Sequence, residues 1–124
     1  MPDLRVLLRD EPGKRVLLLG NEAIARGILE AGISVVTTYP GTPASEIGDS
    51  ISAIAAEAGL YMEYSTNEIV AVEVAAGVAN CGVRALTAMK HVGLNVAADA
   101  LMTLAYMGVK GGYVIVTADD PECY

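Results

Sequence analysis

The sequence predicts an α/β domain with three layers, in which a parallel sheet carries helices on both faces. Two observations lead to this prediction. Short apolar runs alternate with longer segments of helical periodicity along the whole chain, and most of these segments end at a glycine. Such a strand–helix alternation implies parallel strands joined by right-handed crossovers. The 124 residues suffice for one core, so a single domain over residues 1–124 is expected.

The first strand of the sheet is expected near the beginning of the chain. Residues 1–14 form either an arm or an extra edge strand in this interpretation. The run RVLLL at residues 15–19 is continuous and apolar, as in a strand buried on both faces. Asn21 is expected to cap the helix that follows, which ends at Gly32.

The next segments predict two strands around a helix. Residues 33–39 (ISVVTTY) are rich in β-branched side chains, which favours a strand. After a turn, isoleucines at helical spacing predict a helix over residues 44–58 that ends at Gly59. Residues 60–64 form a third, weaker strand.

The second half continues the alternation. A nearly apolar helix is predicted over residues 67–81 and is expected to be buried on most sides. A strand follows at 83–89, then a helix at 94–107 and a fifth strand at 112–118. The strand ends define one edge of the sheet, where ligands bind in folds of this class.

Composition excludes several classes of function. The net charge of −7 argues against a nucleic-acid binder, which needs a basic footprint. The mean hydropathy is high at +0.45, but no window is long enough for a membrane span and the N-terminus does not resemble a signal peptide. A cytoplasmic protein without a membrane partner is expected. Cys81, expected inside the buried helix, and Cys123 suggest neither a disulfide framework nor a metal site.

Glu68 is notable because a carboxylate in the first turn of a nearly apolar helix is costly to bury. Thr66 is expected to cap this helix, which would make Glu68 its second residue. Three interpretations are open: a solvated glutamate that complements the helix dipole, a buried salt bridge with Lys90 or Arg84, or a carboxylate that faces a ligand. The small residues that follow (AVEVAAGVANCG) favour the third interpretation.

Two other polar segments fall at the same predicted edge. The turn at 39–43 (YPGTP) has two interpretations. It is a plain turn in which Thr42 caps the next helix, or it directs a hydroxyl and backbone N–H groups at an anion. The segment KHVGLN brings Lys90, the only histidine (His91) and Asn95 to the end of a buried strand. A lone histidine is often structural, but three polar groups together at a ligand edge favour binding.

Other signatures are weak or missing. Asp119 and Asp120 precede a proline and are expected in a solvated loop, so no metal site is predicted in this chain. A GxGxxG fingerprint does not follow the first predicted strand, and GxxxxGK[ST] is also missing, which disfavours dinucleotide and P-loop binding.

The motifs resemble a known family. The segments YPGTPASEI, STNEIVAVEVAAGVANCGVRALTAMKHVGLNVAADALMTLAYMGVKGGYVIV and ADDP closely resemble the start of the α subunit of indolepyruvate:ferredoxin oxidoreductases. These enzymes are the indolepyruvate branch of the thiamine-diphosphate-dependent 2-oxoacid:ferredoxin oxidoreductases. The resemblance covers about residues 14–121, and MKHVGLNVAAD is specific to that branch. It implies that the chain is the family's pyrimidine-binding domain.

The resemblance also implies roles for the residues at the edge. Glu68 matches the catalytic glutamate that hydrogen-bonds N1′ of the cofactor's aminopyrimidine, a contact that prepares the 4′-nitrogen to take a proton from the thiazolium. Thr42 matches the family's threonine near the thiazolium. Lys90 and His91 occupy a place from which they would contact the substrate carboxylate or an acyl intermediate. The remaining implied contacts are Pro40 and Gly41 with the cofactor and Asn95 with the substrate.

The family's diphosphate/Mg²⁺ motif and its iron–sulfur cysteines do not occur in this sequence. We therefore expect the N-terminal fragment of a longer chain, inactive alone, whose partners are a diphosphate-binding domain carrying Mg²⁺ and a β/γ-type subunit within an oligomer. The resemblance implies that the whole enzyme decarboxylates aryl pyruvates such as indolepyruvate to acyl-CoA and reduces ferredoxin through 4Fe-4S clusters. The alternatives are a non-catalytic assembly domain of the same fold and, less consistent with the sequence, a flavodoxin-like ligand-binding domain.

Overall fold

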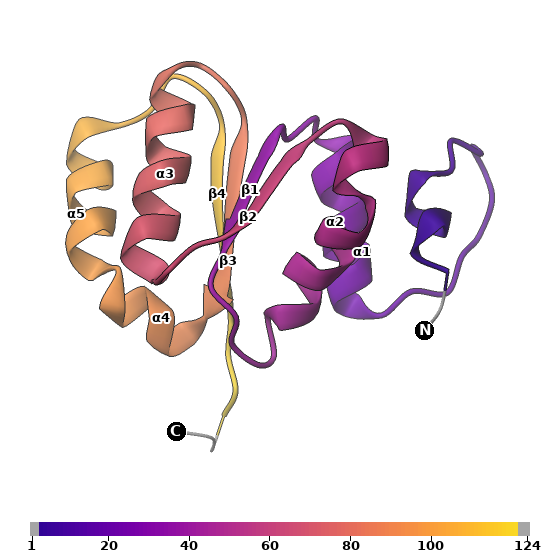
Figure 1. Ribbon diagram of the computed structural model, residues 1–124, viewed down its shortest axis with the longest axis horizontal. Coiled ribbons are helices and arrows are strands. Elements are labelled where there is room, and N and C mark those ends of the chain that lie inside the picture. The colour runs from indigo at the N-terminus through magenta and orange to yellow at the C-terminus, as the bar shows by residue number, and fades with distance from the viewer. Residues whose placement is uncertain (1–2, 122–124) are drawn as a thin grey trace.

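The protein is built around a four-stranded, fully parallel sheet between two layers of helices (Figure 1). The computed structural model describes residues 3–121. The strands are β1 (Val35–Thr38), β2 (Tyr61–Tyr64), β3 (Ala85–Lys90) and β4 (Tyr113–Ala118), and they lie in the order β2-β1-β3-β4. Every pairing in this sheet is parallel. The predicted three-layer α/β class is therefore confirmed.

The sheet divides the core into two parts, one beneath each helical layer (Figure 1). One layer holds α1 (Gly20–Glu30) and α2 (Ser45–Ala58), with the short 3-10 helix η1 (Leu4–Leu8) packed outside them. The other layer holds α3 (Glu68–Asn80), α4 (His91–Val96) and α5 (Ala98–Met107). The larger core cluster lies under α1 and α2 and comprises Leu7, Ala25, Ile28, Ile33, Val36, Ile47, Ile51, Ile54, Leu86 and Ala88. The smaller cluster lies on the α3 side and comprises Val72, Met89, Ala97 and Ala100.

The strand predicted at residues 15–19 does not form, so that prediction is wrong. This segment runs along the helical layer to α1 (Figure 1), and Leu17 is 98% exposed. Its last residue, Leu19, precedes α1 and donates its backbone N–H to the Glu22 carboxylate at 2.8 Å. Four consecutive apolar residues at positions 16–19 do not by themselves specify a strand. Residues 4–8 form η1, so the interpretation of residues 1–14 as an edge strand is also wrong.

Two predicted helix caps differ from the structure. The first helix begins at Gly20, and the Asn21 side chain instead donates to the Pro43 carbonyl at 2.7 Å, which ties α1 to the turn after β1. Helix α3 is capped by Asn67 rather than Thr66, because Asn67 Oδ1 accepts the Val70 N–H at 2.9 Å. Glu68 is therefore the first helical residue.

The later helices also depart from prediction. The helix expected over 94–107 is divided at Ala97 into α4 and α5, and α4 begins directly after β3. Helix α3 is buried on one side only, through Ala71, Val72, Ala75 and Ala79. Its other side faces a groove against α5 with a volume of ≈ 260 Å³. Cys81 is exposed rather than buried because it follows the last turn of α3. Cys123 lies outside the described residues.

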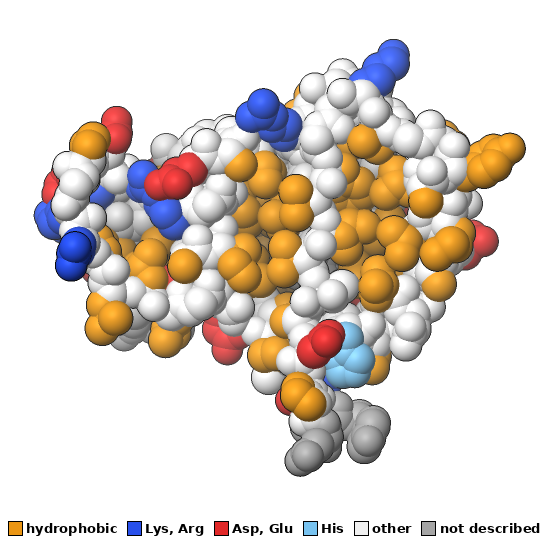
Figure 2. Space-filling model, turned by 180° about the vertical axis from the view of Figure 1, so that it is seen from behind, with side chains coloured by type: hydrophobic (Ala, Val, Ile, Leu, Met, Phe, Trp, Pro, Cys, Tyr) orange, Lys and Arg blue, Asp and Glu red, His pale blue; other side chains and the backbone are white. Residues whose placement is uncertain are grey.

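The sheet has one apolar, unprotected edge. Within residues 3–121, β4 pairs only with β3, although its sequence YVIVTA is typical of a strand with neighbours on both sides. Val114 is 48% exposed. Figure 2, which views the molecule from behind, shows apolar side chains gathered on both sides of a column of white atoms, which are backbone or other side chains. None of the helices in the described part of the chain is long and apolar enough to cross a bilayer.

Candidate functional site

The carboxyl ends of the parallel strands bring four segments together at one edge of the sheet, which is the lower edge in Figure 1. These segments are the turn after β1, the connection from β2 into α3, the junction of β3 with α4, and the residues after β4. They carry most of the candidate residues predicted from the sequence. Ligands bind at this edge in open α/β sheets.

Glu68 lies against Gly93, the third residue of α4. A Cβ atom added to Gly93 would be 2.7 Å from both Cγ and Oε1 of Glu68 and 3.0 Å from its Cδ. The glutamate side chain therefore occupies the space that any other residue at position 93 would fill. Glu68 is half-buried, and among residues 3–121 its carboxylate forms no hydrogen bond or ion pair. The carboxylate is thus held at the ligand edge with its oxygens available.

Hydroxyl groups of the sheet fix the position of α3. Thr37 donates from Oγ1 to the Ala71 carbonyl at 2.8 Å, one turn after Glu68. The Oγ1 atoms of Thr37 and Thr87 lie 2.7 Å apart, and Thr87 Oγ1 is also 2.7 Å from the Tyr113 hydroxyl. Burial raises the pKa of Tyr113 to about 12, so this phenol stays protonated and can hydrogen-bond at neutral pH. Three strands are thereby linked to the helix that begins with Glu68.

The turn after β1 packs directly on Lys90. A Cβ atom at Gly41 would be 2.9 Å from Lys90 Cβ, so glycine permits this close approach. The Thr42–Pro43 peptide bond is cis, and Thr42 and Pro40 are exposed. The interpretation of Thr42 as a helix cap is wrong, because the N-cap of α2 is Ala44 and no side chain caps that end.

Lys90 pairs with Asp120 rather than with Glu68. Lys90 Nζ lies 3.2 Å from Asp120 Oδ2, and both side chains are more than two-thirds buried. The expectation of a solvated loop is therefore wrong for Asp120. The predicted alternative of a salt bridge between Glu68 and Lys90 or Arg84 is also wrong. Lys90 is paired with Asp120, and Arg84 donates to the Ala31 carbonyl at 2.6 Å.

The histidine and the asparagine of the KHVGLN segment have different surroundings. His91 is the first residue of α4, and its Nδ1 atom is buried without a hydrogen-bond partner in the described structure. Buried polar atoms of this kind are uncommon in native proteins, and an ordered water, an ion or a ligand is the usual partner. Asn95 is exposed on α4.

Sequence reasoning missed Gly93 and the Lys90–Asp120 pair. A glycine inside the short KHVGLN segment was a possible signal, since glycine often marks a close approach. The polar contacts of Thr37 and Thr87 were also missed, although both are polar residues within buried strands.

The residues at this edge fit the pyrimidine half of a thiamine cofactor. Within residues 3–121 they provide a carboxylate without a hydrogen-bond partner, on Glu68, and beside it a histidine with an unpartnered ring nitrogen. They do not fit a divalent metal, because no three His, Cys, Asp or Glu residues gather anywhere in residues 3–121. A diphosphate–Mg²⁺ group would need ligands from elsewhere.

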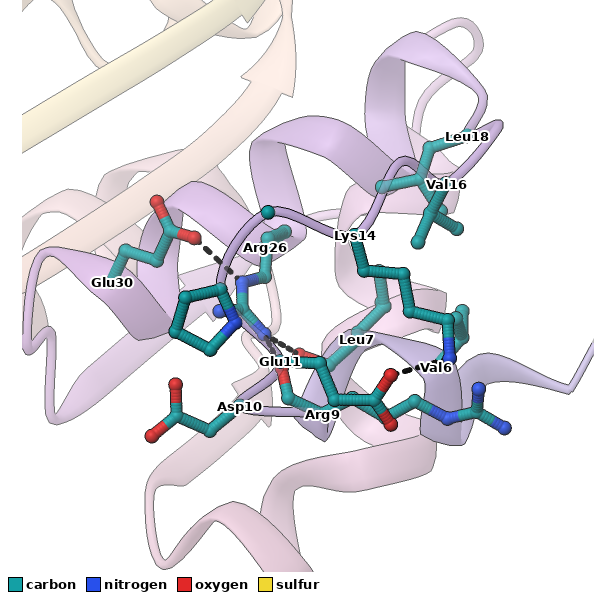
Figure 3. Close-up of a pocket in the computed structure, with 12 residues that line it drawn as sticks. Val6, Leu7, Arg9, Asp10, Glu11, Lys14, Val16, Leu18, Arg26 and Glu30 are labelled. Atoms are coloured by element: carbon teal, nitrogen blue, oxygen red, sulfur yellow. Dashed lines mark hydrogen bonds and ion pairs between the residues drawn. The ribbon is translucent and has the colours of Figure 1, made fainter.

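A cavity of ≈ 450 Å³ lies far from this edge, beneath the N-terminal segment (Figure 3). Several of its polar groups already have partners within the protein. Arg26 donates to the Leu7 and Arg9 carbonyls at 2.7 Å each and pairs with Glu30, and Lys14 pairs with Glu11. We interpret this cavity as the space under a folded-back segment and not as a ligand site.

Comparisons with known proteins identify the family to which the chain belongs. The family model for the thiamine-diphosphate-binding part of pyruvate flavodoxin/ferredoxin oxidoreductases matches residues 26–116. The indolepyruvate oxidoreductase subunit IorA of Pyrococcus abyssi is 61% identical over 96% of this chain, and that of Methanothermobacter thermautotrophicus is 54% identical over 98%. This chain covers 18% and 20% of those two relatives.

A solved structure shows the same fold. The 2-oxoglutarate:ferredoxin oxidoreductase from Magnetococcus marinus, with 2-oxoglutarate, coenzyme A and succinyl-CoA bound, aligns with a TM-score of 0.79. The alignment covers 88% of this chain and 19% of that chain, at 21% sequence identity. At this identity the likeness establishes the fold alone.

Proposed function

Since the chain belongs to the family of thiamine-diphosphate-binding domains of pyruvate flavodoxin/ferredoxin oxidoreductases, we propose that it is the pyrimidine-binding domain of an indolepyruvate-type oxidoreductase. One observation carries the proposal: Glu68 presents an unpaired carboxylate at the ligand edge of the sheet, supported from below by Gly93. A glutamate that only complements the helix dipole from solvent would not need to pack against Gly93. A structural ion pair would have a cation, whereas Lys90 is paired with Asp120 and Arg84 donates to the Ala31 carbonyl.

The proposed roles follow from what each residue can do. Thiamine diphosphate, when bound, supplies the carbon nucleophile and the electron sink for decarboxylation of a 2-oxoacid. Glu68 would share a proton with N1′ of the aminopyrimidine, and the half-buried surroundings strengthen that hydrogen bond. The turn containing Gly41 and Thr42 would lie against the cofactor. Lys90 would bind the substrate carboxylate through a charge-assisted hydrogen bond, and His91 would contact the substrate or an acyl intermediate.

The whole enzyme would extend well beyond this chain, which covers about a fifth of its curated relatives. We propose that it oxidatively decarboxylates aryl pyruvates to acyl-CoA and reduces ferredoxin. Mg²⁺ with its diphosphate-binding domain, the 4Fe-4S clusters and a β/γ-type subunit would come from outside residues 1–124. The apolar surface beside β4 would suit such a partner domain. The cytoplasmic location stays a prediction from the sequence.

The test uses the complete enzyme, prepared without oxygen. The measured rate is the reduction of a viologen dye that depends on aryl pyruvate and CoA, with thiamine diphosphate and Mg²⁺ present. Glu68→Gln is expected to lower this rate by about two orders of magnitude or more, the scale of proton-transfer catalysis. Glu73→Gln is the matched control, because Glu73 lies exposed on the same helix.

The outcomes separate the proposal from its rival. A native rate in Glu68→Gln would show that the glutamate only complements the helix dipole. The absence of activity in the native enzyme, with every tested 2-oxoacid, would favour a non-catalytic assembly domain. A loss in Glu68→Gln with no loss in Glu73→Gln is the result that we expect.

A further inference from the structure

We propose that Gly93 is a positioning residue for Glu68: its missing side chain leaves the space that holds the glutamate carboxyl group in place to meet the aminopyrimidine. This inference rests on the proposed function, because it concerns the same site. It adds Gly93 of α4 to the residues that determine the position of the Glu68 carboxylate.

The first argument is distance. An added Cβ at Gly93 would approach Cγ and Oε1 of Glu68 to 2.7 Å and Cδ to 3.0 Å. Non-bonded carbon atoms prefer separations of about 3.5–4.0 Å. The entire carboxyl end of Glu68 therefore lies on the bare Cα of Gly93. Any side chain at position 93 would have to exchange places with it.

The second argument is that the backbone does not require glycine here. Gly93 lies inside α4, and the glycines with positive φ among residues 3–121 are elsewhere in the chain, at positions 13, 32, 59, 82 and 108. Alanine favours a helix more than glycine does. Neither backbone conformation nor helix formation explains this residue, which leaves the space above it as the explanation.

The third argument is that Glu68 is the part that would move. The backbone of α4 continues from β3, and the Gly93 carbonyl accepts the Ala97 N–H at 2.9 Å. Helix α3 is held to the sheet at the Ala71 carbonyl. The Glu68 side chain has three rotatable bonds and no hydrogen bond within residues 3–121 to hold it. Gly93→Ala should therefore keep the fold and displace the carboxylate.

The experiment is a double-mutant cycle in the complete, cofactor-free enzyme. The variants are Gly93→Ala, Glu68→Ala and the double variant. Gly77→Ala is the control, because Gly77 is also helical and an added Cβ there would meet nothing within 4 Å. Calorimetric titration with thiamine diphosphate, with Mg²⁺ present, gives the affinity, and thermal unfolding reports the fold.

We expect Gly93→Ala to weaken thiamine diphosphate binding by about tenfold to 100-fold with an unchanged melting temperature, since small misplacements have effects of this size. Because Gly93 acts through Glu68, the double variant should bind no more weakly than Glu68→Ala. Gly77→Ala should stay within about twofold of the native affinity, the scale of error in additivity.

Three results would overturn the inference. The first is native affinity in Gly93→Ala. The second is losses that multiply in the double variant, because they would show that Gly93 acts independently of Glu68. The third is a lowered melting temperature in Gly93→Ala, which would indicate a packing role.

A crystal structure of the cofactor-free Gly93→Ala variant gives an independent readout. A displaced Glu68 carboxyl group supports the inference, whereas a shift of α4 with the carboxyl group unmoved contradicts it. Native affinity in Glu68→Ala would overturn the proposed function as well. Native affinity in Gly93→Ala alone would leave that function intact.

Discussion

The hydroxyl oxygens of Thr37 and Thr87 lie 2.7 Å apart at paired positions of β1 and β3, in the buried centre of the sheet. Thr37 also donates to the Ala71 carbonyl of α3, and Thr87 contacts the Tyr113 hydroxyl of β4. A parallel sheet usually meets its covering helices through apolar side chains alone. Here three strands are hydrogen-bonded to one helix, and that helix carries the candidate carboxylate at its first residue.

Removing the central hydroxyl should destabilise the protein. Thr87→Val keeps the shape of the side chain but leaves the Thr37 and Tyr113 hydroxyls without this partner. We expect the free energy of unfolding to fall by about 1–3 kcal/mol, the typical result of leaving a buried polar group unsatisfied. Urea unfolding measures it. Thr117→Val is the control, because Thr117 is exposed on β4. A loss in Thr87→Val no larger than in this control would contradict the prediction.

The buried phenol of Tyr113 predicts a loss of stability in alkali. Burial raises the pKa of Tyr113 to about 12, above the ordinary value of about 10. Between these values the unfolded chain has released the proton and the folded chain retains it, so stability falls as pH rises from about 10 to about 12. Urea unfolding across this range should show a shallower fall for Tyr113→Phe.

The effect of Tyr113→Phe should be partial. Burial and a hydrogen bond to Asp49 also raise the pKa of Tyr64 to about 12, so part of the alkaline loss belongs to Tyr64. Tyr106→Phe is the matched control, because the Tyr106 ring is 95% exposed. If Tyr113→Phe and Tyr106→Phe share the native pH dependence, Tyr113 does not contribute as predicted.

Lys90 should affect substrate rather than cofactor. If its ammonium group binds the 2-oxoacid carboxylate, Lys90→Met removes a charge-assisted hydrogen bond, which is worth about 1.5–3 kcal/mol. We expect the KM for aryl pyruvate to rise by about tenfold or more in the complete enzyme, while the affinity for thiamine diphosphate is unchanged. Lys110→Met is the control, because Lys110 is exposed and precedes β4 at the opposite edge of the sheet. Equal effects on both ligands would instead indicate that Lys90 stabilises the site only through Asp120.

The order of elements could be predicted from the sequence because strands of a parallel sheet must alternate with helices. The helix ending at Gly59 illustrates this, since a left-handed glycine closes it as its position suggested. The run at 15–19 shows the limit. Its composition suits a buried strand, but burial depends on a neighbouring strand that the local sequence cannot specify.

The candidate site was predictable in its place and not in its contacts. Strand ends determine where Glu68, Lys90 and His91 meet, whatever those residues bind. The space above Gly93 and the pairing of Lys90 with Asp120 depend on side chains 25 and 30 residues apart in sequence. Such distant contacts follow from packing rather than from local patterns. The binding roles of these residues stay predictions.

The strand order has a consequence for how the site is assembled during synthesis. A growing chain completes β1, α2 and β2 first, and it can already extend α3 with Glu68 at its start. The residues that support the glutamate arrive only with β3 and α4, which must insert beside β1 on the side opposite to β2. Parallel pairings of this kind close long loops and form slowly. Nascent or truncated chains that end before residue 90 would thus contain Glu68 but lack Gly93, against which its carboxyl group packs. Cofactor recognition would begin only once strands have been added on both sides of β1.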